Sequence, residues 1–137
     1  MSEDLIIVQN LIYEIRGQRV MLDSDLAKLY QVTTGALNQA VKRNMERFPA
    51  DFMFRLTDEE VLNMMSQSVI SSKRKASSPP FAFTEQGVAM LASVLKSPIA
   101  IAVSISIMRA FVQVRQYLLT TASMSSNFGS SVPRWIS

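Results

Sequence analysis

The stretch DSDLAKLYQVTTGALNQAVKRNMERF, residues 23–48, contains two amphipathic segments separated by a short polar break. In the first segment, the residues expected on one side of a helix are Leu26, Ala27, Leu29 and Tyr30. In the second segment, one apolar stripe at helical spacing consists of Leu37, Val41, Met45 and Phe48. Either Asp23 or Ser24 offers a side-chain oxygen that can cap the first helix. Pro49 ends the second, so the sequence predicts a helix pair with its second helix over about 34–48.

The break between these helices has the spacing of a helix-turn-helix unit. Two short helices that meet at a sharp angle need a small residue at their contact, and Ala27 stands at that position. Gln31 opens the turn, where the backbone takes a left-handed conformation that costs a non-glycine residue about 1 kcal/mol. Thr33 or Thr34 can cap the second helix. In such a unit the second helix can enter the major groove of DNA.

The side of the second helix opposite its apolar stripe is polar and basic. Asparagine and glutamine can form two hydrogen bonds to adenine, arginine can do so with guanine, and lysine or arginine can hold a phosphate. Hydroxyls and free amides at the helix start are further phosphate ligands. The predicted DNA-contacting residues are therefore Thr33, Thr34, Asn38, Gln39, Lys42, Arg43 and Arg47. The alternative is that they only solvate the outer face of an amphipathic helix.

The charge distribution favours nucleic-acid binding near this helix, although the formal net charge of the chain is only +3. Residues 1–33 hold three basic and five acidic side chains, whereas residues 34–55 hold four basic and two acidic ones. Basic side chains release counterions from phosphates, so local positive density is typical of DNA-binding surfaces. A second basic cluster, Lys73, Arg74 and Lys75, lies in a stretch rich in serine and proline. A DNA-contacting wing and an ordinary solvated loop are equal alternatives for this cluster.

The remaining sequence predicts short strands and further helices. Residues 11–16 and 18–22 are strand-like runs joined by Gly17, a pattern that predicts a β-hairpin. Short strands are also expected over 52–56 and, at a sheet edge, over 81–83. Capping signals at Thr57 and at Thr84–Gln86, together with apolar periodicity, predict helices over about 57–65, 87–95 and 98–119, with a loop over 66–80.

The last helix carries conflicting signals. From Ile99 to Ile107 apolar residues alternate with alanine and serine at the period of a strand, but the apolar segment is too long for one strand. Helix is therefore favoured. Together these elements predict an α+β domain over residues 1–119, with a hairpin, a helix-turn-helix-like pair, short extra strands and C-terminal helices. Residues 120–137 are expected to form a disordered tail.

Composition argues against catalysis and against export. The chain has no cysteine and no histidine, which removes thiol nucleophiles and the commonest general base and metal ligand. Its four glycines are scattered, so no phosphate-cradling loop exists. We expect no enzymatic activity, cofactor or metal. The start is acidic, and the most apolar stretch is interrupted by Lys96, Pro98 and Arg109. Neither a secretory signal nor a membrane span is therefore expected, and the protein should be cytoplasmic.

Four stretches, in this order, resemble the ORF6N domain of phage and prophage proteins. They are IYEIRGQRVMLDSDLAKLYQV, ALNQAVKRNMERFPADFMFRLT, FAFTEQGVAMLASVL and IMRAF. The similarity covers about Leu11–Tyr117, and the family is related to the KilA-N and Bro-N DNA-binding modules. Mapped onto this sequence, the hairpin of the family is Ile12–Leu22, its helix pair is Asp23–Phe48, and its RFP.DFMF motif is Arg47–Phe54.

The resemblance implies a regulator or antirepressor that binds double-stranded DNA in the bacterial nucleoid or a phage-infected cell. It adds no catalytic residues. Family members commonly have glycine at the position of Gln31, and longer members continue past the last helix into a coiled coil or a second domain. The alternative is an antirepressor that needs no DNA and binds a repressor protein, or itself, through the helix over 98–119. Homodimerisation fits either function.

Overall fold

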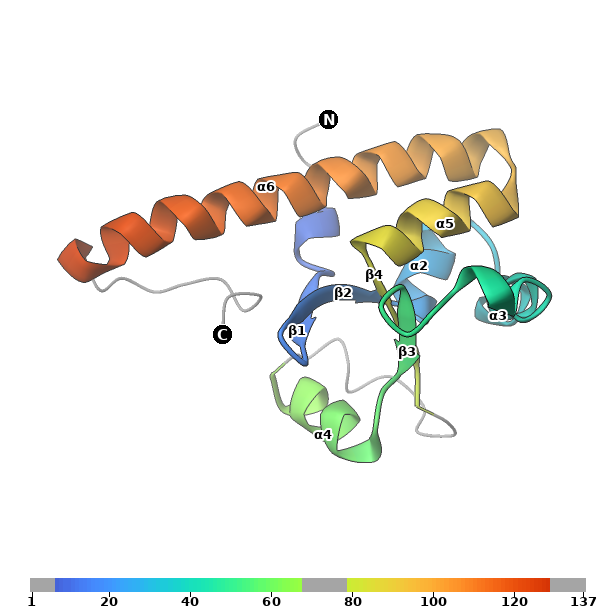
Figure 1. Ribbon diagram of the computed structural model, residues 1–137, viewed down its shortest axis with the longest axis horizontal. Coiled ribbons are helices and arrows are strands. Elements are labelled where there is room, and N and C mark those ends of the chain that lie inside the picture. Colours follow the sequence, from blue (N-terminus) through green and yellow to red (C-terminus); the bar gives the residue numbers. More distant parts are fainter. Residues whose placement is uncertain (1–6, 68–78, 129–137) are drawn as a thin grey trace.

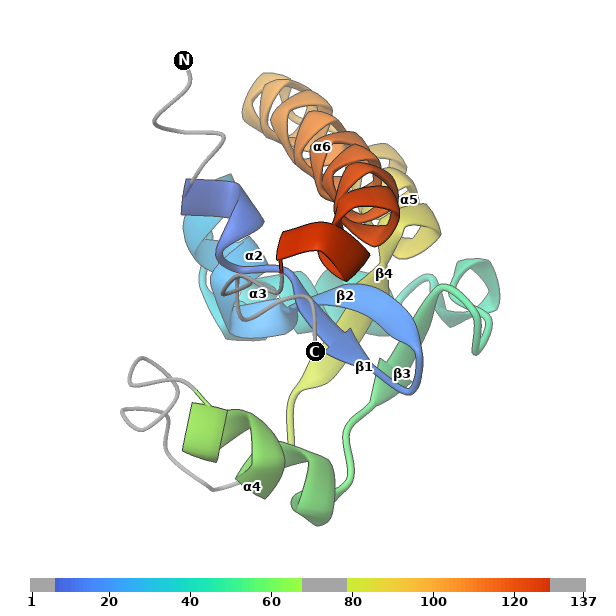
Figure 2. The ribbon, with the colours of Figure 1, turned by 90° about the vertical axis from the view of Figure 1, so that its left-hand side faces the viewer.

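The computed structural model describes residues 7–67 and 79–128, which form a four-stranded antiparallel sheet with helices on both faces (Figure 1). The elements in chain order are β1 (Tyr13–Ile15), β2 (Gln18–Leu22), α2 (Asp23–Tyr30), α3 (Thr34–Lys42), the 3-10 helix η1 (Met45–Arg47), β3 (Met53–Arg55), α4 (Asp58–Gln67), β4 (Phe81–Thr84), α5 (Glu85–Leu95) and α6 (Pro98–Phe128). The α+β prediction is confirmed. Both views place α5 and α6 on one side of the sheet and α4 on the other (Figure 2).

The predicted hairpin is β1 and β2, joined by a tight turn. Ile15 pairs with Gln18, so only Arg16 and Gly17 lie between the strands. Both have positive φ angles, 56° for Arg16 and 74° for Gly17. Two successive left-handed residues form the mirror-image turn whose twist matches that of paired strands. Glycine takes this conformation without strain, whereas Arg16 does not.

Strand β4 lies inside the sheet, and the prediction that residues 81–83 form an edge strand was wrong. The strand order is β1-β2-β4-β3, so Phe83 is opposite Met21 on one side and Met53 on the other. The segment FAFT carries no charge, and three of its four side chains are buried. An uncharged strand with buried side chains on both faces is typical of the interior of a sheet. Strands β2 and β3 pair with its two edges.

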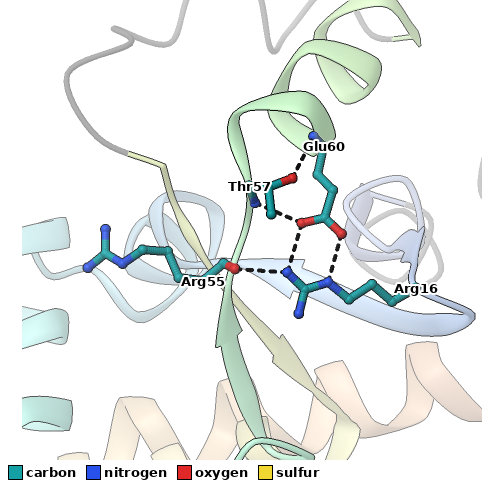
Figure 3. A network of polar contacts seen from close by, with 4 residues as sticks. All are labelled: Arg16, Arg55, Thr57 and Glu60. Carbon is teal, nitrogen blue, oxygen red and sulfur yellow. Dashed lines mark hydrogen bonds and ion pairs between the residues drawn. The ribbon is translucent and has the colours of Figure 1, made fainter.

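On the face of the sheet toward α4, a polar network around Glu60 (Figure 3) lies beside a smaller apolar cluster that includes Phe54. Thr57 and Glu60 form a reciprocal capping box, with Thr57 N donating to Glu60 Oε1 at 2.8 Å and Glu60 N donating to Thr57 Oγ1 at 3.1 Å. The guanidinium of Arg16, at the hairpin turn, donates to Glu60 Oε2 at 2.7 Å and to the carbonyl of Arg55 at 3.1 Å. Its hydrogen bond to Glu60 lowers the pKa of that carboxyl to about 2. The predicted cap at Thr57 is thus confirmed.

The larger apolar core lies on the opposite face, between the sheet and the other helices. Its fully buried members include Met21, Leu26, Leu37, Phe83, Leu91, Ile107 and Phe111.

Thr84 caps α5 by accepting from Gly87 N at 3.3 Å, which confirms the capping predicted there. Gly87 lies so close to the chain before β3 that an added Cβ would be 2.0 Å from the carbonyl oxygen of Phe52. Glycine is therefore needed for α5 to pack on the sheet at this distance.

Helix α6 settles the conflict between strand and helix in favour of helix. It runs to Phe128, so the segment expected to be a tail from residue 120 begins as helix, and residues 129–137 lie outside the described residues. By length and composition alone, Pro98–Leu119 is apolar enough to cross a membrane, and 33% of an 18-residue window within it is buried inside the fold. Helix α4 continues to Gln67, two residues into the predicted loop over 66–80. Residues 68–78 of that loop lie outside the described residues.

Candidate nucleic-acid interface

The carboxylate of Asp23 fixes the relative positions of α2, α3 and β4. The residue is 3% exposed, and it accepts from Ser24 N at 2.7 Å, Asn38 Nδ2 at 3.1 Å and Phe81 N at 3.3 Å. The N-cap of α2 is Leu22 and makes no side-chain cap, so the prediction that Asp23 or Ser24 caps the helix was wrong. Asp23 lies one position later, in the first turn, where its charge is favourable against the helix dipole.

The turn between α2 and α3 has the left-handed residue expected at Gln31, with φ 62° and ψ 41°. Gln31 N donates to Lys28 O at 3.2 Å and Val32 N donates to Ala27 O at 3.0 Å. These two bonds form a Schellman motif, which ends a helix and turns the chain sharply. Ala27 is 1% exposed, which agrees with the small residue predicted at the contact between the helices.

Helix α3 is held by its apolar side and leaves its polar side open. Thr33 caps the helix by accepting from Ala36 N at 3.0 Å, while Leu37 and Val41 are buried in the core. Gln39 and Lys42 are exposed on the other side, as is Arg43 at the C-cap. The first turn of α3 contains no acidic side chain, so the positive end of its dipole is not neutralised there.

Helix α3 ends at Lys42, and the prediction that it continues to residue 48 was wrong. Asn44 Nδ2 donates to the carbonyl of Ala40 at 2.9 Å, and Asn44 has the non-helical angles φ −134° and ψ 36°. A short polar side chain that bonds nearby backbone competes with helical hydrogen bonds in this way. Met45 is consequently 47% exposed. Phe48 is buried in the core, where its ring packs edge-on against the ring of Phe83 with the two ring centroids 6.0 Å apart.

Asn38 does not belong to the exposed side, contrary to the sequence-based expectation. Its side chain is half-buried and directs its amide nitrogen to Asp23. Among the described residues, Asn38 Oδ1 is a buried oxygen with no hydrogen-bond partner. Asn38 is therefore a positioning residue of the helix pair, because its polar atoms face the protein.

The other predicted site residues are only partly brought together. Thr33, Gln39, Lys42 and Arg43 are exposed on or beside α3, and Thr34 is half-buried at its start. Arg47 lies in η1 and donates to Ser93 Oγ of α5 at 3.3 Å, so it links this surface to the next helix. Lys73, Arg74 and Lys75 lie outside the described residues.

One further exposed basic residue, at the end of α5, is not singled out by the sequence pattern. Lys96 is exposed at the C-cap of α5, three residues after Ser93, and has a left-handed φ of 54°. Helix α5 contacts α3, and the hydrogen bond from Arg47 to Ser93 joins it to η1. Residues 34–47 carry three basic side chains against one acidic one. The exposed side of α3 and η1 can therefore offer an amide, two guanidinium groups and the ammonium group of Lys42 to an anionic polymer.

Comparison with known protein families gives a match over more than half of the chain. The family model of the ORF6N domain matches residues 10–94, which run from just before the hairpin to the last turn of α5. The match includes the whole sheet, the helix pair and η1, and it stops before α6. No curated protein and no solved structure gives a significant match.

Proposed function

The chain belongs to the ORF6N domain family, and from that premise we propose that it binds double-stranded DNA as a phage-type regulator or antirepressor. The observation that supports this most directly is the open polar side of α3. Gln39, Lys42 and Arg43 are exposed there, on a helix whose orientation is fixed by the turn at Gln31. A short helix presented in this way is the reading element of helix-turn-helix proteins.

In this proposal the start of α3 approaches the base edges. Gly35 and Ala36 are exposed and small, so the backbone of the first turn can come close to the groove floor. Gln39 lies one helical turn further along, where its amide can form two hydrogen bonds to adenine. The methyl group of Ala36 can contact the methyl group of thymine. Base readout is thus assigned to the N-terminal half of the helix.

The cationic residues provide phosphate contacts around this centre. Lys42 and Arg43 lie at the C-terminal end of α3, and Arg47 lies beyond it in η1. Contacts of this kind fix the orientation of a protein on the duplex but carry little sequence information. The hydroxyl of Thr33 already accepts the Ala36 amide, so it contributes to DNA binding mainly by holding the helix start in place.

Selection of bound sequences from a random duplex pool at two salt concentrations tests the proposal. We expect an enriched motif at both concentrations. Lys42→Ala and Arg43→Ala should each weaken binding about tenfold and reduce the slope of log affinity against log salt by about 0.9 per lost phosphate contact. Arg109→Ala removes the same charge from an exposed position on α6 and should leave affinity within about twofold. Unchanged affinity in both α3 variants would falsify the assignment of this helix.

A second candidate function is an antirepressor that works by protein contact without DNA. The observation that favours it is an apolar surface on α6, where Ile101 and Leu119 are 55% and 70% exposed. Capture of a repressor protein that persists after nuclease treatment, together with no enriched motif in the duplex selection, would support this function over DNA binding.

A further inference from the structure

Helix α6 has two separate apolar sides. One is packed in the core and includes Ala100, Ile107, Ala110, Phe111 and Val114, each at most 1% exposed. The other, which we call the outer stripe, consists of Ile101, Ile105, Met108, Val112 and Leu119. Four of these are 37–70% exposed and Met108 is half-buried. Within residues 7–67 and 79–128, no element covers the outer stripe.

The outer stripe has the spacing of a coiled-coil seam. Its residues follow one another at intervals of four, three, four and seven, which is the alternation of four and three that defines a heptad repeat. The interval of seven contains Arg115 at the position where the next apolar residue would stand. The stripe is about 27 Å long, since each helical residue advances the axis by about 1.5 Å. This periodicity indicates that the surface is complementary to another α-helix.

We propose that a second copy of this chain packs its own α6 along the outer stripe, so that the protein is a homodimer. A stripe related to itself by a twofold axis is self-complementary, and this is the commonest symmetry of protein dimers. Figures 1 and 2 show α6 as the outermost element on its side of the sheet, so a second copy can reach it along its length.

The outer stripe has almost no flanking charge that could select a different partner helix through ion pairs. Pro98–Leu119 contains no acidic residue. Arg115 is already paired with Glu85 of α5 at 2.8 Å, which neutralises the one charge that interrupts the outer stripe. Partner choice in coiled coils is set mainly by charges that flank the seam. Here Arg109 is the only unpaired charge on the flanks within Pro98–Leu119, and its long side chain can turn toward solvent. Apolar self-complementarity is the stronger signal.

Sedimentation equilibrium of the full chain tests the proposal. We expect twice the monomer mass at tens of micromolar. Ile105→Glu and Val112→Glu each place a carboxylate in the apolar seam of both copies and should weaken dimerisation by about 100-fold. Gln113→Glu adds the same charge to an exposed position outside the outer stripe and should leave the dimer intact. Unchanged far-ultraviolet circular dichroism and melting temperature would show that the variants remain folded.

Three results would overturn the proposal. The first is a wild-type chain that stays monomeric up to about 200 µM, a concentration at which even weak specific dimers form. The second is loss of the dimer in Gln113→Glu to the same extent as in Ile105→Glu. The third is a monomer that pellets with vesicles of phosphatidylcholine and phosphatidylglycerol, because the outer stripe would then be a membrane-binding surface. None of these measurements involves DNA, so they are independent of the function proposed above.

Discussion

Single residues of the helix pair separate what local chemistry determines from what packing determines. The left-handed conformation of Gln31 and the small Ala27 follow from the requirements of a tight turn between helices, and the sequence predicts both. The direction of Asn38 does not follow from helical spacing. It depends on Asp23, whose buried carboxylate attracts the Asn38 amide across the helix contact. A polar residue at the border of an amphipathic helix can face either way until its neighbours are known.

Asn38→Ala should reduce the free energy of unfolding by about 1–3 kcal/mol, because it removes one of the donors to a buried carboxylate. Gln39→Ala, at the exposed neighbouring position, should change it by less than about 0.5 kcal/mol and should weaken DNA binding instead. Urea denaturation and a binding titration on the same two proteins check this contrast. Equal stability of the two variants would mean that the Asp23–Asn38 contact does not hold the helix pair.

Gln31→Gly should raise the free energy of unfolding by about 0.5–1 kcal/mol, because glycine adopts the left-handed conformation without steric strain. Gln39→Gly introduces the same residue into a right-handed helical position and should lower it by about 1 kcal/mol. Thermal denaturation of both variants measures whether the free energy of unfolding rises in the first and falls in the second. A destabilised Gln31→Gly protein would indicate that the Gln31 side chain makes a contribution larger than the strain.

At the scale of helices and strands, the sequence predicts where most elements begin but not where all of them end or lie. Thr33, Thr57 and Thr84 mark helix starts because a hydroxyl at the N-cap satisfies a free amide. The early end of α3 depends on one side-chain bond from Asn44, which the apolar periodicity up to Phe48 conceals. The interior place of β4 depends on pairing with strands distant in sequence, which no local pattern encodes.

Gly87→Ala should lower the free energy of unfolding by about 3 kcal/mol, because its Cβ would overlap the backbone oxygen of Phe52 and push α5 off the sheet. Gly35→Ala is the matched control in α3, where an added Cβ meets nothing within 4 Å. It should leave stability unchanged or raise it by up to about 1 kcal/mol. Chemical denaturation of the two variants measures the difference. A Gly87→Ala protein as stable as Gly35→Ala would contradict the close packing of α5.

Glu60→Gln should reduce stability at pH 7 but not at pH 2. The pKa of Glu60 is lowered to about 2 in the folded chain, chiefly by the hydrogen bond from Arg16. The ionised carboxylate therefore stabilises the fold above the ordinary glutamate pKa, and this contribution is lost as the pH falls toward 2. We expect a difference of at most about 1 kcal/mol at pH 7, since the pair is partly exposed. Glu59→Gln removes an exposed carboxylate in the same turn without breaking the hydrogen bonds from Arg16, so it should destabilise the fold less at pH 7; melts at pH 7 and pH 2 compare the two variants.

At the scale of the whole molecule, the sequence predicts the α+β class and most of the buried residues of the helix pair, but not the two apolar sides of α6. The strand-like alternation from Ile99 to Ile107 arises because two helical stripes overlap in one segment. Ile107 faces the core, whereas Ile101 and Ile105 belong to the outer stripe. Only the packing of α6 on α5 and the sheet shows which residues face inward. A function that depends on two copies is therefore harder to predict than one carried by α3.

The proposed dimer should affect DNA binding at a distance from α3. On a duplex that holds two copies of the selected motif, Ile105→Glu should weaken binding about tenfold or more, because the two copies no longer assist each other. On a duplex with one copy, its affinity should equal that of wild type within about twofold. Electrophoretic mobility shifts on the two duplexes make the comparison, with Gln113→Glu as the control. Equal losses on both duplexes would mean that the outer stripe itself contacts DNA.

The hydrogen bond from Phe81 N to Asp23 limits how small a working fragment of this protein can be. It spans 58 positions of the chain, and the same strand fills the middle of the sheet between β2 and β3. A peptide that stops after β3 contains every residue of α2 and α3 but lacks the donor and the strand that fix them. We expect such a peptide, or the helix pair grafted onto another scaffold, to lose the geometry of α3. The recognition proposed for α3 thus depends on long-range closure of the chain, although the residues that would carry it lie within 26 consecutive positions.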